Sequence, residues 1–377
     1  MRVLISCGGT GGHINPGLAI ADIIKQKYPD AEFLFAGTPK GMEAKLVPQA
    51  GYRLETIKVA GFQRRISIEN IGRNAKAVAY LATSGRRAKA IIEDFKPDIA
   101  IGTGGYAAGP VIRKAARMGI PTAIHEQNAY PGVTNRLLSK EVDYVMLTVK
   151  EALDFMDKSK FEYSVTGLPV RSNINTISKS EARRKLGFND DFTILSFGGS
   201  LGAGCINETM TAAIKWHYGK KLSINHIHGY GGMGKETFPQ AMEAAGIPLR
   251  SDRLRITEYI NDMDVCLAAA DLVICRSGAS TLAELEAAGK ASILIPSPIV
   301  AGNHQYHNAM VLGKAGAAVV IEQKDVTDDR IISEIEKLYN APDRVEVMSK
   351  SAADLHLSDT NERILAVVEK LIAKGIK

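Results

Sequence analysis

Short apolar runs alternate with longer segments of helical periodicity along the N-terminal part of the chain. An apolar run at residues 3–7 is followed by glycines and then by a helical pattern at residues 16–27. Further apolar runs of the same kind cover residues 32–36, 99–102, 122–125 and 144–147. Buried strands separated by helices are typical of a parallel sheet covered on both faces. The pattern therefore predicts an α/β fold with a doubly wound parallel sheet.

The same rhythm starts again after a turn at residues 166–169. The second set of predicted strands covers residues 193–197, 222–226, 255–257, 272–275, 292–296 and 318–321. A chain of 377 residues has the length of two such domains. We therefore predict two Rossmann-like domains, one at residues 1–167 and the other at residues 168–355.

The last segment, residues 356–377, predicts a helix with one strongly apolar face. Asp359 and Glu362 have the spacing of a capping box at its start. An apolar stripe then consists of Ile364, Val367, Val368 and Leu371. Such a stripe needs a partner, and we expect this helix to pack back on the first domain.

Composition excludes several classes of protein. Apolar residues make up 45% and charged residues 23%, which excludes a disordered chain. The four cysteines are scattered without metal-ligand spacing, which excludes a disulfide scaffold and suggests a reducing compartment. We expect no targeting segment. Residues 291–313 lack charged side chains but contain prolines and polar groups, so they do not predict a membrane span.

Positive charge is concentrated in one window of the sequence. Residues 61–90 contain seven arginines and lysines and a single acidic residue, Glu69, which accounts for the net charge of +6. Such a window fits nucleic acid, an anionic membrane surface or simply a solvated helix face. The window alone does not decide among these three readings.

Glycine-rich loops follow three of the predicted strands, at residues 8–12, 102–109 and 198–203. Glycines let backbone N–H groups approach a phosphate or a sugar, and the helix that follows adds a positive dipole. The carboxyl ends of parallel strands meet at one edge of a sheet. Together the loops predict a ligand in a cleft between the domains.

One glycine loop also resembles a dinucleotide fingerprint. Gly102, Gly104 and Ala107 have the required spacing, and Glu126 lies 22 residues beyond Gly104. This match would indicate NAD, but it does not follow the first strand of the domain, which weakens it. A Walker-type phosphate loop is absent from the sequence.

Several polar residues allow two readings. His13 ends the first glycine loop, where it is either a general base or a local hydrogen-bonding group. Asp262 and Asp264 resemble a metal-binding pair, but they precede a helix and are better explained as helix-terminal charge. His304 and His307 lack a third ligand, so we do not expect zinc there.

The segment at residues 275–289 carries the clearest ligand signal. A strand ends, small residues turn, and a helix begins with Glu284 in its early turns. Such a helix start can bind phosphate, and a nearby carboxylate can bind ribose hydroxyls. Ordinary capping with an acidic first turn explains the same pattern. The polar loop at residues 303–308 could contact sugar hydroxyls.

Seven motifs occur in a fixed order across residues 8–309. They are GGTGGHINP, GTGGYAAGP, HEQNAYPG, TGLPVR, GGSLGA, RSGASTLAE and NHQYHNA. Together they resemble glycosyltransferase family 28, in particular its MurG-type peptidoglycan N-acetylglucosaminyltransferases. The resemblance implies a GT-B fold, in which two Rossmann-like domains face each other across a cleft. It also implies that the protein needs no bound metal or other cofactor.

The resemblance implies an inverting transfer of N-acetylglucosamine from UDP-GlcNAc to lipid I, the acceptor whose MurNAc 4-hydroxyl attacks. The product would be lipid II, the precursor of peptidoglycan. Arg171 would lie against the uracil, Ile260 would meet the base edge and Glu284 would bind the ribose. The residues placed near the diphosphate are Ser200, Ala279, Ser280 and Thr281.

The remaining site residues implied by the resemblance concern the two sugars. His13 would be the general base, with Tyr106 and Glu126 facing the acceptor. The donor sugar would be contacted by Thr10, Gly11, Gly12, Asn128 and Gln305. His304 stands where some relatives have a second glutamine, so its hydroxyl contact is not carried over.

A lipid-linked acceptor implies work at a membrane surface. We predict peripheral docking of residues 61–90 on the cytoplasmic face of the bacterial membrane, with Phe62 and Ile66 as shallow apolar contacts. Cell-wall synthesis proteins are expected as partners and nucleic acid is not. The alternatives are a diacylglycerol glycosyltransferase, a non-catalytic nucleotide-sugar-binding scaffold and, last, an NAD-dependent dehydrogenase.

Overall fold

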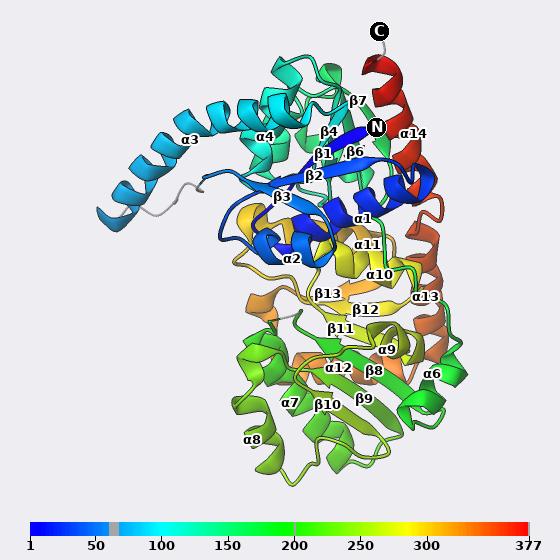
Figure 1. Cartoon of the computed structure of the whole chain (residues 1–377). Helices are drawn as coiled ribbons and strands as arrows, with labels where there is room; N and C mark the ends of the chain where they lie inside the picture. Colours follow the sequence, from blue (N-terminus) through cyan, green and yellow to red (C-terminus); the bar gives the residue numbers. More distant parts are fainter. Residues whose placement is uncertain (60–67, 200, 376–377) are drawn as a thin grey trace. The chain divides into compact units, whose positions relative to one another are not determined.

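The computed structural model describes residues 1–59, 68–199 and 201–375; the side chains of residues 68–79, 81 and 82 lie outside this description. The chain divides into two compact units, each of which alternates strands and helices (Figure 1). Unit 1 comprises Met1–Pro169 and Asp359–Lys377, and unit 2 comprises Val170–Ser358.

Seven strands among the described residues of unit 1 form one parallel sheet in the order β3-β2-β1-β4-β5-β6-β7. Its strands are β1 (Arg2–Ser6), β2 (Glu32–Gly37), β3 (Arg53–Thr56), β4 (Ile99–Gly102), β5 (Thr122–Glu126), β6 (Tyr144–Leu147) and β7 (Glu162–Val165). Its helices are α1 (Gly11–Lys27), α2 (Glu43–Gln49), α3 (Ile68–Phe95), α4 (Ala108–Arg117), α5 (Val133–Leu138) and α14 (Thr360–Gly375), with short 3-10 turns at Lys150–Phe155 and Lys158–Lys160.

Alternating side chains of β1 divide between two cores. Leu4 packs with residues of α3, α4 and α5 on one face of the sheet. Val3 and Ile5 pack with residues of α1 and α14 on the other face. Successive side chains of a strand point to opposite faces, so an apolar run is needed to fill both cores.

Helix α14 lies against the sheet of unit 1. Its apolar stripe joins the core that contains Val3 and Ile5, and the members of the stripe are Ile364, Val367, Val368 and Leu371. Lys374 Nζ also contacts Asp143 Oδ1 at 2.6 Å. The carboxylate of Asp359, just before the helix, accepts a hydrogen bond from Arg363 Nε at 2.7 Å. Packing therefore stabilises this helix far more than its surface pairs do.

Six strands in the described part of unit 2 form a second parallel sheet in the order β10-β9-β8-β11-β12-β13. They are β8 (Phe192–Phe197), β9 (Ile224–Gly229), β10 (Leu254–Thr257), β11 (Leu272–Cys275), β12 (Ala291–Leu294) and β13 (Ala318–Val320). The helices are α6 (Lys179–Leu186), α7 (Gly204–Gly219), α8 (Thr237–Glu243), α9 (Met263–Ala269), α10 (Ala279–Ala287), α11 (His304–Lys314), α12 (Asp328–Tyr339) and α13 (Pro342–Leu355), with 3-10 turns at Gly232–Gly234, Ala301–Asn303 and Gln323–Asp325.

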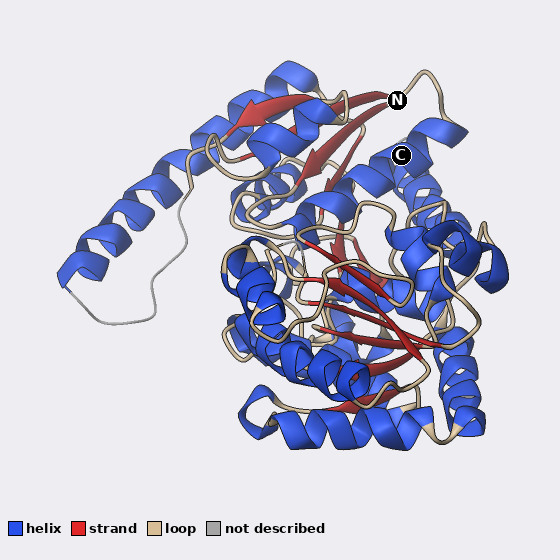
Figure 2. Ribbon diagram, turned by 90° about the horizontal axis from the view of Figure 1, so that it is seen from below, coloured by secondary structure: helices blue, strands red, loops and turns tan. Residues whose placement is uncertain are grey.

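Both sheets have the strand order of a Rossmann fold. The order reverses between β1 and β4 in unit 1 and between β8 and β11 in unit 2. Helices flank the strands on both faces of each sheet (Figure 2). The structure thus confirms two doubly wound parallel sheets. Ligands of such folds bind beyond the carboxyl ends of the strands at the reversal, where the predicted glycine loops begin.

Candidate active site

Two glycine-rich turns of unit 1 touch at the carboxyl ends of β1 and β4. Gly105 has a φ of +84°, and a Cβ at this position would lie 2.1 Å from the carbonyl oxygen of Gly8. Gly104, with a φ of +105°, lies against the imidazole of His13, where a Cβ would be 2.7 Å from Nδ1. Only glycine fits at either position.

His13 lies in the first turn of α1. This helix begins at Gly11, five residues before the predicted start at residue 16. The hydroxyl of Thr103 donates a hydrogen bond to the carbonyl oxygen of His13 at 2.7 Å, which ties α1 to the turn after β4. The imidazole is half-buried, and its Nδ1 lies 3.1 Å from Oε1 of Gln127.

Glu126 is buried at the end of β5, with an exposed fraction of 1%. Its carboxylate accepts hydrogen bonds from the backbone N–H of Asn128 at 2.9 Å and of Gly132 at 3.1 Å, and from Asn135 Nδ2 at 2.8 Å. Glu126 therefore organises the turn that follows β5. The dinucleotide fingerprint requires this carboxylate to bind a ribose. That interpretation is wrong, because the carboxylate is buried and already accepts hydrogen bonds from within the protein.

Glu43 holds the first glycine loop in the same way, through hydrogen bonds from the backbone. This buried residue at the start of α2 accepts hydrogen bonds from the backbone N–H of Thr38 at 2.8 Å and of Gly9 at 3.0 Å. Burial raises the pKa of Glu43, but the hydrogen bonds from Thr38 and Gly9 outweigh burial and lower it overall. Glu43 is therefore a fixed anion beneath the loop, which sequence analysis missed.

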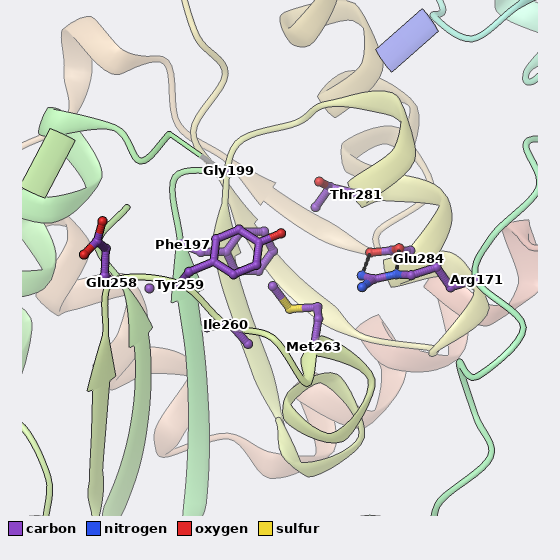
Figure 3. Close-up of a pocket in the computed structure, with 10 residues that line it drawn as sticks. Arg171, Phe197, Gly199, Glu258, Tyr259, Ile260, Met263, Thr281 and Glu284 are labelled. Atoms are coloured by element: carbon purple, nitrogen blue, oxygen red, sulfur yellow. Dashed lines mark hydrogen bonds and ion pairs between the residues drawn. The ribbon is translucent and has the colours of Figure 1, made fainter. Parts of the chain in front are cut away.

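Unit 2 contains a pocket of about 150 Å³ at the carboxyl ends of its strands. Arg171 donates two hydrogen bonds to Glu284 in its wall, from Nε to Oε1 at 2.7 Å and from Nη2 to Oε2 at 2.8 Å (Figure 3). These bonds raise the pKa of Arg171. The pocket is also lined by Phe197, Gly199, Gly229, Glu258, Tyr259, Ile260, Met263 and Thr281.

Ile260 forms part of the pocket wall and lies close to Gly229. Ile260 is buried, and a Cβ on Gly229 would lie 3.1 Å from its Cδ1. Tyr259 beside it is 56% exposed although it lines the same pocket. The pocket thus combines a buried aliphatic side chain, an accessible aromatic ring and an oriented carboxylate.

Helix α10 begins at this pocket. Its N-cap residue, Gly278, has extended backbone geometry, and Ala279, Ser280 and Thr281 form the first turn. The N–H groups of a first turn have no partner inside the helix, so they suit an anion. Gln305 in α11 lies nearby in the fold, because its carbonyl oxygen accepts a hydrogen bond from Ser277 Oγ at 2.8 Å.

Two family models match the chain. The glycosyltransferase family 28 N-terminal domain matches residues 3–147, and the glycosyltransferase family 28 C-terminal domain matches residues 193–364. The chain belongs to glycosyltransferase family 28. The resemblance inferred from the seven motifs is confirmed.

Curated relatives in family 28 align over nearly their full length. An Acetivibrio thermocellus protein is 45% identical over 99% of this chain and 98% of its own. A Desulforamulus reducens protein is 42% identical over 99% of this chain and 100% of its own. Both are named UDP-N-acetylglucosamine–N-acetylmuramyl-(pentapeptide) pyrophosphoryl-undecaprenol N-acetylglucosamine transferase.

One solved structure agrees with the family 28 assignment, and a second shows the fold alone. The crystal structure of Acinetobacter baumannii MurG aligns with a TM-score of 0.78 and 27% identity, over 98% of this chain and 99% of that one. A Staphylococcus aureus MnaA–UDP structure aligns with a TM-score of 0.66 at 13% identity, over 99% of this chain and 98% of that one, and shows the fold alone. The predicted GT-B class, with two Rossmann-like domains, is confirmed.

The predicted family 28 residues that the structure describes are divided between the two units. In unit 1, Thr10 is the N-cap residue of α1, Gly11 and Gly12 share the first turn with His13, and Tyr106 is 59% exposed in the turn after β4. In unit 2, one pocket is lined by Arg171, Ile260, Thr281 and Glu284. Ser200 lies outside the described residues.

The side-chain amides of Asn128 and Gln305 form hydrogen bonds within the protein. Asn128 Nδ2 donates to Glu126 Oε1 at 3.1 Å. Gln305 Oε1 accepts a hydrogen bond from the backbone N–H of Ser297 at 2.9 Å. Both side chains are therefore oriented before any sugar binds.

The residues that resembled metal ligands, Asp262 and His304, have other interactions in the structure. Both oxygens of Asp262 accept hydrogen bonds from Arg255, at 2.7 and 2.8 Å, and this pairing lowers the pKa of Asp262. His304 Nδ1 lies 3.0 Å from the carbonyl oxygen of Ala301. Over residues 1–59, 68–199 and 201–375, no group of three or more His, Cys, Asp or Glu side chains forms a metal site.

Arg276 also escaped the sequence analysis, although it stands in a quoted motif. It follows β11, and its Nη1 donates to the carbonyl oxygens of Ile295 at 3.0 Å and Pro296 at 3.1 Å. Its Nη2 donates to Gln323 Oε1 at 2.6 Å. Arg276 thus joins the turns after β11, β12 and β13, a role that depends on contacts between distant residues.

The basic window lies only partly in the described structure. Phe62, Ile66, Arg64 and Arg65 lie outside the described residues, as do the side chains of Arg73 and Lys76. Arg87 Nη2 pairs with Glu55 at 2.6 Å, and Lys89 Nζ with Glu93 at 3.3 Å. Of the helices that the structure describes, none combines the length and apolarity needed to cross a bilayer.

Proposed function

We propose that this protein transfers N-acetylglucosamine from UDP-GlcNAc to the 4-hydroxyl of MurNAc in lipid I, which yields lipid II for peptidoglycan. The observation that carries the proposal is the 45% identity, over nearly the whole of both chains, to a relative named for this transfer. The two family 28 domains and the pocket of unit 2 support it.

The donor would occupy the unit 2 pocket. Arg171 takes one lone pair on each oxygen of Glu284, which leaves further lone pairs for the ribose hydroxyls. The backbone of Ile260 would meet the edge of the uracil. The diphosphate would lie at the first turn of α10, against Ala279, Ser280 and Thr281.

His13 would act as the general base of an inverting displacement. Its Nε2 accepts the proton of the MurNAc 4-hydroxyl while that oxygen forms a bond to the anomeric carbon. The bond from the anomeric carbon to the diphosphate oxygen breaks at the same time, and its electron pair leaves with UDP. N–H groups at helix starts stabilise the charge that develops on UDP. The α-linked donor thus gives a β-linked product.

Tyr106 and Glu126 have different parts in this proposal. The exposed Tyr106 would contact the acceptor directly. Glu126 would act through the turn that it holds, where Asn128 would reach the donor sugar. Thr10, Gly11 and Gly12 would present backbone N–H groups beside His13.

Because lipid I is anchored by a polyprenyl chain, the enzyme would work as a peripheral protein on the cytoplasmic face of the bacterial membrane. Residues 61–90 would supply the basic contact, and cell-wall synthesis proteins would be its neighbours. Sedimentation with liposomes tests the contact. Binding should increase with anionic lipid and decrease with salt, and binding indifferent to both would contradict it.

The substrates are tested by incubating the full chain with a short-chain lipid I analogue and labelled donor. We expect transfer from UDP-GlcNAc and much less from UDP-glucose. A diacylglycerol acceptor serves as the alternative substrate in a parallel reaction. Transfer to diacylglycerol alone, or binding of UDP-GlcNAc without transfer to either acceptor, would overturn the proposal.

A further inference from the structure

We propose that Gln127 and His125 fix the tautomer of His13, so that Nδ1 carries the hydrogen and Nε2 carries the lone pair. All three residues belong to unit 1. The tautomer follows from hydrogen bonds and burial, and only its use in catalysis rests on the proposed function. Gln127 and His125 are thus positioning residues rather than catalytic ones.

The chain of hydrogen bonds begins at Gly167. Its carbonyl oxygen, which can only accept, lies 3.0 Å from His125 Nε2, so that nitrogen must carry a hydrogen. His125 is fully buried, and burial lowers its pKa to about 4, so its imidazole is neutral near pH 7. His125 Nδ1 is therefore an acceptor.

The side-chain amide of Gln127 contacts this acceptor, and only one of its two flip orientations satisfies the hydrogen bonds. Its Nε2 lies 2.9 Å from the carbonyl oxygen of His125 and 3.2 Å from His125 Nδ1. An amide NH₂ has a hydrogen for each of these acceptors, whereas an amide oxygen would face two lone pairs. Gln127 is 2% exposed, so water does not compensate for the wrong orientation. Oε1 of Gln127 therefore points away from His125.

That oxygen lies 3.1 Å from His13 Nδ1. Because an amide oxygen can only accept, Nδ1 of His13 must donate, and a neutral His13 then has its lone pair on Nε2. Gly104 packs against the imidazole of His13, and the hydroxyl of Thr103 binds the backbone carbonyl of His13. Both contacts limit rotation of the imidazole. The basic nitrogen is thus the one that Gln127 does not occupy.

The amide of Gln127 can stabilise a protonated His13, which an apolar side chain in its place could not do. When His13 accepts a proton at Nε2, its Nδ1–H becomes a charge-assisted donor, and the bond to Gln127 strengthens. Gln127 cannot take the proton itself. The arrangement therefore prepares His13 to receive a proton from a hydroxyl and stabilises the imidazolium that results.

The tautomer can be measured directly by NMR on the full chain labelled with ¹⁵N-histidine. At about pH 8 an ordinary imidazole is neutral, and the shifts of its two nitrogens distinguish the tautomers. His13→Gln assigns the resonances. We expect the Nδ1–H form for His13 and the Nε2–H form for His125. The Nε2–H form of His13 in the wild type would overturn the proposal without any variant at Gln127.

Gln127→Met supplies the second test, because methionine fills a similar volume without any of the three hydrogen bonds of the amide. We expect loss of the pure Nδ1–H spectrum of His13 and a decrease of about 10- to 100-fold in kcat, with little change in the donor KM. Tyr144→Phe is the matched control, because it removes another partly buried hydrogen bond of unit 1, to Ser164 Oγ at 2.8 Å. It should leave the His13 spectrum unchanged.

The two proposals fail in different ways. An unchanged His13 spectrum in Gln127→Met would overturn the positioning role of Gln127. If the Nδ1–H form is present but His13→Gln retains full turnover, the tautomer assignment stands and the general base of the proposed function is wrong.

Discussion

The carboxylate of Glu284 is oriented by Arg171 through both of its oxygens, at 2.7 and 2.8 Å. Glu284 remains only partly exposed, with a side-chain fraction of 17%, whereas Arg171 is 48% exposed. A partly exposed pair of this kind contributes little to stability. Its value lies in fixing the direction of lone pairs that a ribose can use.

Glu284→Ala should therefore weaken donor binding more than the chemical step. Loss of hydrogen bonds to a charged group predicts an increase of about 10- to 100-fold in the KM for UDP-GlcNAc. Steady-state kinetics with the donor varied measure this increase. Glu286→Ala, on the same helix but outside the pocket lining, is the control. An unchanged donor KM in Glu284→Ala would argue against the ribose contact.

A residue's role can be predicted from the sequence when its interactions are with residues close to it in the chain. His13 and Glu284 stand next to a glycine turn and a helix start, whose local signals are visible in the sequence, whereas Arg171 was predicted only from the family resemblance. Glu43 and Gln127 act through contacts with residues 34 and 114 positions away, and no local pattern records such contacts. The buried role of Glu126 escaped for the same reason, because burial depends on the whole unit.

At the scale of elements, the glycine turns position α1 and α4. The turn after β4 can approach the turn after β1 only because Gly105 has no side chain. Edge strands β3 and β7 escaped prediction, because they are short and partly exposed and so lack an apolar run. The start of α1 was misplaced because Pro16 suggested a first helical position, whereas Gly11 and Gly12 already belong to the helix.

Gly105→Ala should disrupt the unit 1 site. The added Cβ meets the carbonyl oxygen of Gly8, and the residue must keep a positive φ. We expect the free energy of unfolding to fall by about 2 kcal/mol or more, with a lower kcat. Gly119→Ala separates the two causes, since Gly119 has a φ of +78° but no heavy atom within 4 Å of its added Cβ. Urea unfolding should show a clearly smaller loss for this control, and equal losses would refute the steric argument.

For the whole molecule, acid stability depends on buried histidines, which are His125 in unit 1 and a cluster of three in unit 2. Nε2 of His217 lies 3.0 Å from Nδ1 of His226, and Ser196 Oγ lies 2.8 Å from both His226 Nε2 and His228 Nδ1. Burial lowers the pKa of His217 to about 4 and that of His228 to about 3. Burial and the neighbouring histidines also lower the pKa of His226.

The folded state therefore binds fewer protons than the unfolded state below the ordinary histidine pKa of about 6.5. The stabilisation is complete above that pH and is lost as the pH falls through about 4 for His217 and about 3 for His228. Each histidine should contribute up to about 1.4 kcal/mol per pH unit in this window. Urea unfolding at pH 7.5 and pH 5 measures the difference. Equal free energies at the two pH values would contradict the neutral state of these side chains.

The most direct test of the transferase account is the structure of the product formed from UDP-GlcNAc and a lipid I analogue. NMR of the purified product reports both the linkage position and the anomeric configuration. The account predicts a β-1,4 bond from GlcNAc to MurNAc, formed about 10²- to 10⁴-fold more slowly by His13→Gln. An α-linked product, or GlcNAc on any hydroxyl other than the 4-hydroxyl, would contradict it.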